Sequence, residues 1–332
     1  MNGEDILVLT QSDIKGLASP ADYFDAVATG FRAQALGRID LPPPMEIHGL
    51  DGAFHAKGAG GEIDGRRLAA LKLNGNFPFN SARSGLPTVQ GVILLCDAVD
   101  GALMAIMDSI EITLRRTAAA SAVAMDLLAK KTAETLLICG CGVQGRAHAE
   151  ALAHLRPFRR ILAYDADREK TRRFASDIER TVRIPIDPSD DLAAAAQDSD
   201  VIATTTTAHE PILHSPFIRP GTYIAAVGAD SPGKNEISPL LMQRSVVITD
   251  VTDQCAAMGD LRAAIATGAF SRQSVRAELG NVVAGSAQGR RNDDEIIIFD
   301  STGAAFQDLA AAVMVYDRAK AGGKGAWINL RR

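Results

Sequence analysis

Two patterns of hydrophobic positions follow one another along the chain, and the change falls near residue 109. Before it, one stretch has apolar residues at helical spacing, and short strand-like runs then follow closely on each other. Strands so near in sequence indicate an antiparallel or mixed sheet. We expect a helix at residues 19–36, strands at 53–56, 67–73, 89–96 and 103–108, and a hairpin turn at 97–101.

After residue 109 an Ala-rich helix is expected at 112–130, and strands and helices then alternate, which is typical of a parallel, doubly wound sheet. The expected strands are 135–139, 161–164, 201–204, 223–227, 246–248 and 295–299, and the expected helices are 143–155, 168–180 and 306–319. The sequence therefore predicts an α/β protein with a Rossmann domain at 119–304. The last helix is expected to join residues 305–332 to a separate α/β domain formed by 1–118.

Composition limits the classes of function. The chain has 332 residues, 47% of them hydrophobic, and a net charge of −5. These values suit two globular domains and favour neither nucleic acid nor an anionic membrane as a partner. No apolar run approaches the roughly 20 residues of a membrane helix. Residues 1–9 lack the basic start and apolar core of a signal peptide, so we expect a cytoplasmic protein.

The four cysteines give little support to a metal centre. Cys139 and Cys141 form Cys-Gly-Cys, but no second pair has the spacing of zinc ligands, and the six histidines do not supply one. We interpret the cysteines as small hydrophobic residues in a reducing compartment, and we expect no metal.

A glycine-rich turn carries the clearest chemical signal. The apolar run 135–139 leads directly into Gly140-Cys141-Gly142-Val143-Gln144-Gly145, and an Ala-rich helix follows. This is G-x-G-x-x-G between a strand and a helix, the setting that dinucleotide binding requires. Gly140 allows the tight turn, Gly142 lets the backbone approach the pyrophosphate, and Gly145 lets helix and strand pack closely. The helix N-terminus offers free N–H groups to the phosphates.

Asp165 ends the second expected strand and lies 25 residues after Gly140 (165 − 140). This is near the spacing of the carboxylate that binds the adenosine ribose. A carboxylate accepts a hydrogen bond from a 2′-OH and repels a 2′-phosphate, so NAD is predicted over NADP. Arg168, Arg172 and Arg173 follow closely and leave NADP open, because an arginine that folds back could hold the phosphate.

Several motifs, in order, resemble the ornithine cyclodeaminase/mu-crystallin family across most of the chain. Besides the glycine-rich turn, they are Leu71-Lys72-Leu73 with the segment 74–80, Gly85-Leu86-Pro87-Thr88, Met107-Asp108, Arg115-Arg116-Thr117-Ala118-Ala119, Val227-Gly228-Ala229-Asp230-Ser231-Pro232-Gly233-Lys234 and Phe299-Asp300-Ser301-Thr302-Gly303. The resemblance implies a homodimer whose N-terminal α/β domain, with the C-terminal helix, provides the dimer contact and half of the active site. It also implies chemistry at the α-carbon of an amino or imino acid.

The resemblance assigns roles to Lys72, Arg116 and Asp230. Lys72 and Arg116 would bind the substrate carboxylate, and Arg116 is placed with Val143 and Gln144 among the cofactor-binding residues. Asp230 would act as general acid or base at the substrate nitrogen, with Lys72 as a second catalytic group. Asp230 follows an expected strand, where doubly wound sheets place ligands. Thr88 is a weaker substrate-binding candidate, because its hydroxyl could equally cap a strand.

Ordinary structural explanations exist for the same residues. Lys72 could be a solvated charge on a half-exposed strand, Arg116 a helix-surface arginine, and Asp230 the start of the turn Asp-Ser-Pro-Gly. The six histidines do not cluster in sequence and are interpreted as structural or exposed.

The chain departs from the family in two places. Many members have a basic residue shortly after the early prolines, where this chain has Pro44-Met45, and their Met-Pro-Ala is here Lys57-Gly58-Ala59. A cation near the substrate disfavours ornithine or lysine and favours a second carboxylate. We therefore expect a small anionic imino acid, with iminosuccinate giving aspartate as the leading candidate. The alternative is that Lys57 points to solvent.

Three functions remain open from the sequence. The first is an NAD(H)-dependent imine reductase or amino-acid dehydrogenase. The second is a cyclodeaminase, a lyase in which NAD is reduced and reoxidised in each turnover. The third is a non-catalytic protein that binds a small ligand, which retention of Lys72, Arg116 and Asp230 argues against.

Overall fold

The structure, a computed structural model, describes residues 5–330. The chain forms two compact units, Met1–Arg116 with Ala304–Arg332 and Thr117–Gly303. Residues 1–4 and 331–332 of the expected first domain, and with them the start of the segment examined for a signal peptide, lie outside the described residues. Among the described residues, no helix is long and apolar enough to cross a membrane.

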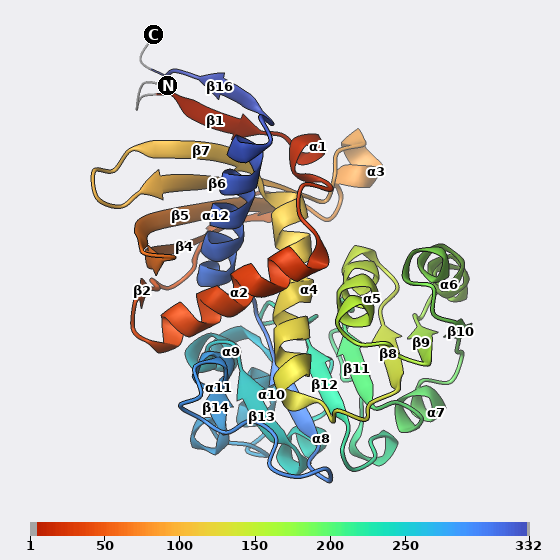
Figure 1. Ribbon diagram of the computed structural model, residues 1–332. Coiled ribbons are helices and arrows are strands. Elements are labelled where there is room, and N and C mark those ends of the chain that lie inside the picture. The colour runs from red at the N-terminus through yellow and green to blue at the C-terminus, as the bar shows by residue number, and fades with distance from the viewer. Residues whose placement is uncertain (1–4, 331–332) are drawn as a thin grey trace. The chain divides into compact units, whose positions relative to one another are not determined.

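The first unit is built on a mixed sheet, as the close spacing of its strands predicts. Its order is β16-β1-β7-β6-β5-β4-β2, with β3 beside β4, and every pair is antiparallel except β1–β7 (Figure 1). The strands are β1 (Ile6–Leu9), β2 (Ile39–Asp40), β3 (Met45–His48), β4 (Ala53–Ile63), β5 (Arg66–Asn76), β6 (Val89–Asp97), β7 (Leu103–Asp108) and β16 (Ala326–Ile328).

Two long helices cover one face of this sheet (Figure 1). Helix α2 (Pro20–Ala35) starts at Ser19, whose hydroxyl and backbone form a capping box with Asp22. Helix α12 (Ala305–Ala321) packs against it, and the rings of Phe31 and Phe306 meet edge to face at 5.0 Å. The short helices α1 (Gln11–Ile14) and α3 (Asn80–Ser84) complete the unit, and α4 (Ser109–Leu128) follows β7.

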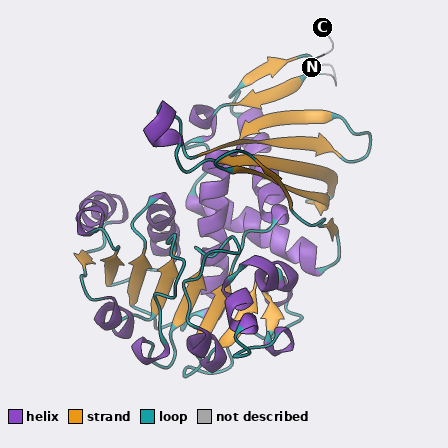
Figure 2. Ribbon diagram, turned by 180° about the vertical axis from the view of Figure 1, so that it is seen from behind, coloured by secondary structure: helices purple, strands orange, loops and turns teal. Residues whose placement is uncertain are grey.

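The opposite face of the mixed sheet, turned to the viewer in Figure 2, carries apolar side chains that remain exposed. Leu71 and Leu73 of β5 are 46% and 39% exposed, and Val92 of the adjacent β6 is 38% exposed. Because strand residues alternate between faces, the same strand β5 buries Leu68 and Ala70 on the helix side. Exposed apolar side chains on neighbouring strands form a continuous surface of the kind that marks protein contacts.

The second unit contains a fully parallel sheet in the order β10-β9-β8-β11-β12-β15-β13-β14, which confirms the predicted doubly wound fold. The strands are β8 (Thr135–Cys139), β9 (Arg160–Tyr164), β10 (Ile186–Pro188), β11 (Val201–Thr204), β12 (Tyr223–Ala226), β13 (Val246–Thr249), β14 (Ala277–Glu278) and β15 (Ile297–Asp300). The helices are α5 (Val143–Leu155), α6 (Arg168–Val182), α7 (Leu192–Gln197), α8 (Pro239–Arg244), α9 (Thr252–Met258), α10 (Asp260–Ala266) and α11 (Leu279–Val283).

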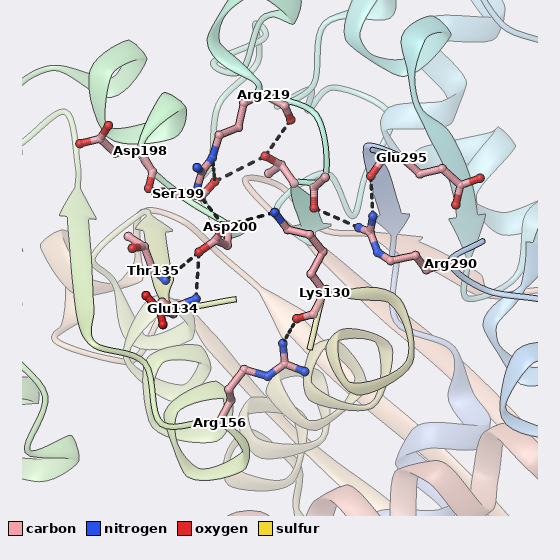
Figure 3. A network of polar contacts seen from close by, with 12 residues as sticks. Lys130, Glu134, Thr135, Arg156, Asp198, Ser199, Asp200, Arg219, Arg290 and Glu295 are labelled. Carbon is pink, nitrogen blue, oxygen red and sulfur yellow. Dashed lines mark hydrogen bonds and ion pairs between the residues drawn. The ribbon is translucent and has the colours of Figure 1, made fainter. Parts of the chain in front are cut away.

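A polar network fixes the edge of the parallel sheet at which β8 and β11 begin (Figure 3). The Asp200 carboxylate accepts the N–H groups of Glu134 and Thr135, and it pairs with Arg219 at 2.7 Å. The carbonyl of Leu128, at the end of α4, accepts a hydrogen bond from Arg290 at 2.6 Å. A cation at the C-terminus of a helix also interacts favourably with its dipole. Because dinucleotide sites lie at the other ends of parallel strands, this network is an anchor rather than a binding site.

Both units differ from the expected elements, and in the second unit β10, β14 and the short helices α7 to α11 were not expected. Strand β4 continues to Ile63, well past the expected end at residue 56. The sequence pattern did not predict this extension, because glycines from Gly58 onward interrupt the apolar alternation that marks a strand. Strands β1, β3 and β16 were not expected, and they are short or largely exposed. Helix α4 begins at Ser109, three residues before the expected start.

Candidate functional site

The glycine-rich turn has the backbone geometry that its sequence predicts. Gly140 has φ of +98°, a left-handed conformation that favours glycine. A Cβ on Gly145 would overlap the carbonyl oxygen of Gly140, so only glycine lets α5 approach the strand so closely. At Gly142, the N-cap of α5, a Cβ would meet no heavy atom within 4 Å. The turn therefore leaves open space beside Gly142 at the helix N-terminus, which is compatible with a pyrophosphate bound by the free N–H groups.

Asp165 lies against this turn. Its carboxylate accepts the N–H of Cys141 at 2.9 Å and, through its other oxygen, the N–H of Asp167 at 2.9 Å. It therefore ties the end of β9 to the glycine-rich turn. Each carboxylate oxygen can accept a further hydrogen bond, so the geometry is compatible with a ribose hydroxyl.

The three arginines after Asp165 that could have held the 2′-phosphate of NADP lie close to acidic side chains instead. Arg168 pairs with Asp190 at 3.2 Å, and Arg173 pairs with Glu169 at 2.9 Å. Arg172 lies 3.9 Å from the same glutamate. None of these contacts directs a guanidinium toward Asp165, and this arrangement favours the ribose hydroxyl over a 2′-phosphate.

Cys139, Cys141 and His148 are buried in the second unit, and their surroundings indicate packing rather than catalysis. Cys139 is fully buried, and burial raises the pKa of the Cys141 thiol to about 12, so neither is a thiolate at neutral pH. His148 is buried between Ser121 and the carbonyl of Gln144, and burial lowers its pKa to about 4. Among residues 5–330, no group of three or more His, Cys, Asp or Glu side chains is arranged to hold a metal ion.

In the first unit, Lys72 and Arg116 lie on either side of one buried carboxylate. Asp308 of α12 contacts Lys72 Nζ through Oδ2 at 2.7 Å and accepts a hydrogen bond from Arg116 Nε through Oδ1 at 2.8 Å. Gln307 accepts a second hydrogen bond from Arg116, at 2.9 Å. Lys72 and Arg116 are 5% and 4% exposed, so neither is the solvated surface charge that the sequence left open.

The electrostatics of this group depend on burial and on the balance of charge. Burial lowers the pKa of Lys72 to about 7; Asp308 opposes this shift, while Arg116 and Lys57 add to it. Burial alone would raise the pKa of Asp308, but the charges of Arg116 and Lys72 outweigh burial and hold that pKa below its usual value. Two cations and one anion leave an excess of positive charge, which suits a carboxylate ligand.

Lys57 and Thr88, the other two residues predicted to bind substrate, differ in the exposure of their side chains. Lys57 of β4 is the cross-strand partner of Lys72 of β5, so the two side chains lie on the same face of the sheet. Lys57 is partly buried, and its charge influences both Lys72 and Asp308. Thr88 is exposed before β6, and its carbonyl accepts the N–H of Phe77 at 2.8 Å.

Asp230 lies in the loop after β12, at the carboxyl end of the parallel sheet. Its side chain is 56% exposed and pairs with Lys234 at 2.7 Å. The same loop continues to Glu236, a fully buried residue whose carboxylate contacts the loops after β11 and β12. Sequence reasoning did not single out Glu236, Asp308 or Gln307. The adjacent Gln307-Asp308 pair, polar within an apolar helix, was the available signal for the last two.

Comparison with known proteins identifies the family and supports the fold. The model of the ornithine cyclodeaminase/mu-crystallin family matches residues 4–323. A solved structure described as an archaeal alanine dehydrogenase dimer with bound NAD has a TM-score of 0.93 and 32% identity, covering 98% of this chain and 99% of that one. The iminosuccinate reductase of Paracoccus denitrificans in complex with NAD⁺ has a TM-score of 0.92 and 31% identity, covering 98% and 100%. The Δ¹-pyrroline-2-carboxylate reductase of Thermococcus litoralis, with NADH and L-proline, has a TM-score of 0.92 and 30% identity, covering 97% and 99%.

Proposed function

Because the chain belongs to the ornithine cyclodeaminase/mu-crystallin family, we propose that it is an NAD(H)-dependent enzyme that reduces a small α-imino acid to the amino acid. The observation that carries the proposal is the buried group of Lys72, Arg116 and Asp308 in a chain that also has a complete dinucleotide turn. A buried pair of cations has a high desolvation cost, and an anionic substrate would stabilise it.

The cofactor is NAD. Gly140, Gly142 and Gly145 form the turn that would hold its pyrophosphate, with Val143 and Gln144 at the helix N-terminus. Asp165 would accept the ribose hydroxyl. When bound, NADH supplies the hydride that the imine α-carbon accepts. Support comes from relatives solved with NAD⁺ or NADH.

The side chains would complete the reaction as follows. Lys72 and Arg116 hold the substrate carboxylate, so that the α-carbon takes a fixed position. Reduction of C=N to CH–NH adds one hydride at carbon and one proton at nitrogen, and Asp230 provides that proton. Its 56% exposure gives Asp230 a route to recover the proton from solvent. Thr88 remains a weaker contact for the substrate.

We infer further that the substrate has a second carboxylate, with iminosuccinate giving aspartate as the leading candidate. The support is the register of β4 and β5, which makes Lys57 the direct neighbour of Lys72 on one face. A side-chain ammonium, as in ornithine, would add positive charge to a group whose cations already repel each other. A second carboxylate would relieve that repulsion.

An NADH-oxidation panel tests the proposal. It contains oxaloacetate with ammonia as the source of the dicarboxylic imine, pyruvate with ammonia as the monocarboxylic one, and a preformed cyclic imine. We expect the highest kcat/KM for the dicarboxylic imine. Lys57→Met should lower that value by about 10–100-fold, the value of one charge-assisted contact, and leave the monocarboxylic imine within about threefold. Lys15→Met, which removes an exposed lysine elsewhere in the unit, is the matched control. Equal losses on both imines would contradict the role of Lys57.

The open face of the mixed sheet supports a homodimer. It exposes Leu71 and Leu73 of β5 beside Val92 of β6, and one relative is described as a dimer. We propose that a second copy of this chain covers that face, because burying such a surface is favourable. Light scattering after gel filtration should give twice the chain mass. Leu73→Asp should yield monomers, whereas Val99→Asp, in the exposed turn between β6 and β7, should not. A monomeric wild type would contradict the proposal.

A further inference from the structure

Glu236 occupies a cage of hydrogen-bond donors in the second unit. Its Oε1 accepts the N–H of Thr206 at 2.6 Å and the hydroxyl of Thr206 at 2.7 Å. Its Oε2 accepts the hydroxyl of Thr204 at 2.6 Å and the N–H of Gly228 at 2.7 Å. The residue is fully buried, so one side chain fastens the loop after β11 to the loop after β12.

These two loops reach the dinucleotide turn on one side and Asp230 on the other. Thr205 donates its hydroxyl to the carbonyl of Gly140 at 3.1 Å and its N–H to the carbonyl of Cys139 at 2.8 Å. In the other direction, the N–H of Asp230 donates to the carbonyl of Gly228 at 3.1 Å. A continuous path of contacts therefore runs from the first glycine of the turn, through the carboxylate of Glu236, to Asp230.

The contacts around Glu236 leave little room for a substitution of either Gly228 or Glu236. A Cβ on Gly228 would overlap the carbonyl oxygen of Thr206 and the carboxyl of Glu236, so the loops meet there without spare room. Hydroxyl donors can rotate and become acceptors, but backbone N–H groups cannot. Because each oxygen of Glu236 faces one backbone N–H, both must be acceptors. A glutamine side chain offers only one such oxygen, and its NH₂ group would face the remaining N–H.

A second and a third buried carboxylate fix the backbone of Glu236. Asp260 accepts the N–H groups of Glu236 and Ile237 at 2.7 and 2.9 Å. Asp300 accepts the N–H of Asp260 at 3.3 Å and that of Leu261 at 2.8 Å. Burial raises the pKa of Glu236, and it raises that of Asp260 to about 7, with the nearby Glu236 adding to the shift at Asp260. Buried carboxylates in such number are costly for stability, which suggests that they serve more than packing.

We propose that Glu236 is a positioning residue, which holds the loop of Asp230 at a fixed place relative to the glycine-rich turn. This inference rests on the proposed imine reduction, in which the proton of Asp230 and the dinucleotide of the turn act on one substrate. Glu236 is fully buried, and its carboxylate accepts hydrogen bonds from protein donors. Its removal should misplace the proton donor while the turn still binds the dinucleotide, and a small misplacement of a catalytic group costs up to about 100-fold in rate.

Glu236→Gln is the principal test, with Glu210→Gln, an exposed glutamate in the loop after β11, as the matched control. Three quantities are measured on the full chain: NADH affinity by fluorescence, kcat with the best imine, and amide hydrogen exchange of peptides covering 204–208, 226–232 and 140–146. We expect NADH affinity within about threefold, a fall in kcat of about 10–100-fold, and faster exchange in 204–208 and 226–232 but not in 140–146. Glu210→Gln should match the wild type.

Thr204→Val gives a milder version that keeps the carboxylate and removes one hydroxyl donor to it. It should show the same pattern with a kcat loss of about 2–10-fold, and it serves if Glu236→Gln does not fold. Unchanged kcat in both variants overturns the proposal. So does a loss of kcat and NADH affinity in equal proportion, with faster exchange throughout the unit, because Glu236 would then be merely structural. If the wild type reduces no imine, the proposed function fails. The hydrogen-exchange pattern of Glu236→Gln still shows whether Glu236 holds the two loops together.

Discussion

The carboxylate of Asp308 lies 2.7 Å from the ammonium of Lys72, and the two residues are 236 positions apart in sequence (308 − 72). The last long helix thus returns to the first sheet and supplies the counter-charge for a buried cation. The same carboxylate also accepts a hydrogen bond from Arg116. The three charges of Lys72, Arg116 and Asp308 are therefore interdependent, because removing one leaves the others buried without compensation.

Asp308→Asn should destabilise the protein. It leaves Lys72 and Arg116 buried without their counter-charge, and breaking a buried pair in this way costs about 3–5 kcal/mol. Urea unfolding, followed at pH 7, measures the loss. Asp317→Asn is the control on the same helix, because Asp317 is half exposed and pairs with Arg66; its cost should stay below about 1 kcal/mol. Equal costs for the two variants would contradict the buried-pair account.

The pKa of Lys72, about 7, predicts a pH dependence of substrate capture. As the pH rises through 7, the free enzyme loses the ammonium that would bind the substrate carboxylate, so kcat/KM should fall on the alkaline side. Lys72→Arg keeps its charge at all these pH values. The kcat/KM of the wild type divided by that of Lys72→Arg should therefore decrease by about tenfold per pH unit above 7. Titration of the imine affects both enzymes equally and does not change this ratio. A constant ratio from pH 6 to 9 would show that Lys72 does not titrate there.

Asp230→Asn tests the proton donor. The substitution keeps the size of the side chain and removes its titrating proton, so turnover should fall by about 10²–10⁴-fold. NADH affinity should barely change. Asp253→Asn, at a strongly exposed aspartate of α9, is the control and should behave as the wild type. Near-normal turnover of Asp230→Asn would reduce Asp230 to a turn residue paired with Lys234.

Asp165 should set the preference for NAD(H). The carboxylate would accept a ribose hydroxyl and repel a 2′-phosphate, and loss of a charge-assisted hydrogen bond corresponds to about 10–100-fold. Asp165→Ser should therefore narrow the ratio of kcat/KM for NADH over NADPH by that factor. Asp187→Ser, at an exposed aspartate of β10, should leave the ratio unchanged. A wild type that prefers NADPH would contradict the assignment.

Much of the second unit could be predicted from the sequence because its signals are local. The run from Thr135 to Gly145 contains strand, turn and helix start in consecutive residues. The structure gives a steric reason for Gly140 and Gly145, and it leaves open space beside Gly142. The central parallel strands β8, β11 and β12 are short apolar runs, and all of their residues are buried in the sheet. Local patterns of this kind need no knowledge of distant contacts.

The parts that could not be predicted depend on contacts between distant segments. Strand β1 is recognisable only once it pairs with β7 and β16, which lie about 100 and 320 residues later. The partner of Lys72 comes from α12, and the donors to Glu236 come from the end of β11 and from the loops after β11 and β12, which precede it by 8 to 32 residues. A charge on an apolar strand signals that a partner exists, but the fold alone determines which residue that partner is.

Net reduction of an imino acid consumes NADH, and the ratio of NADH oxidised to amino acid formed tests this function most directly. With wild-type protein, oxaloacetate and ammonia, we predict one NADH oxidised for each aspartate formed, measured by absorbance and by amino-acid analysis of the same samples. Ornithine with NAD should give neither proline nor NADH. Efficient formation of proline from ornithine, without net change in NADH, would contradict the account and make the protein a cyclodeaminase.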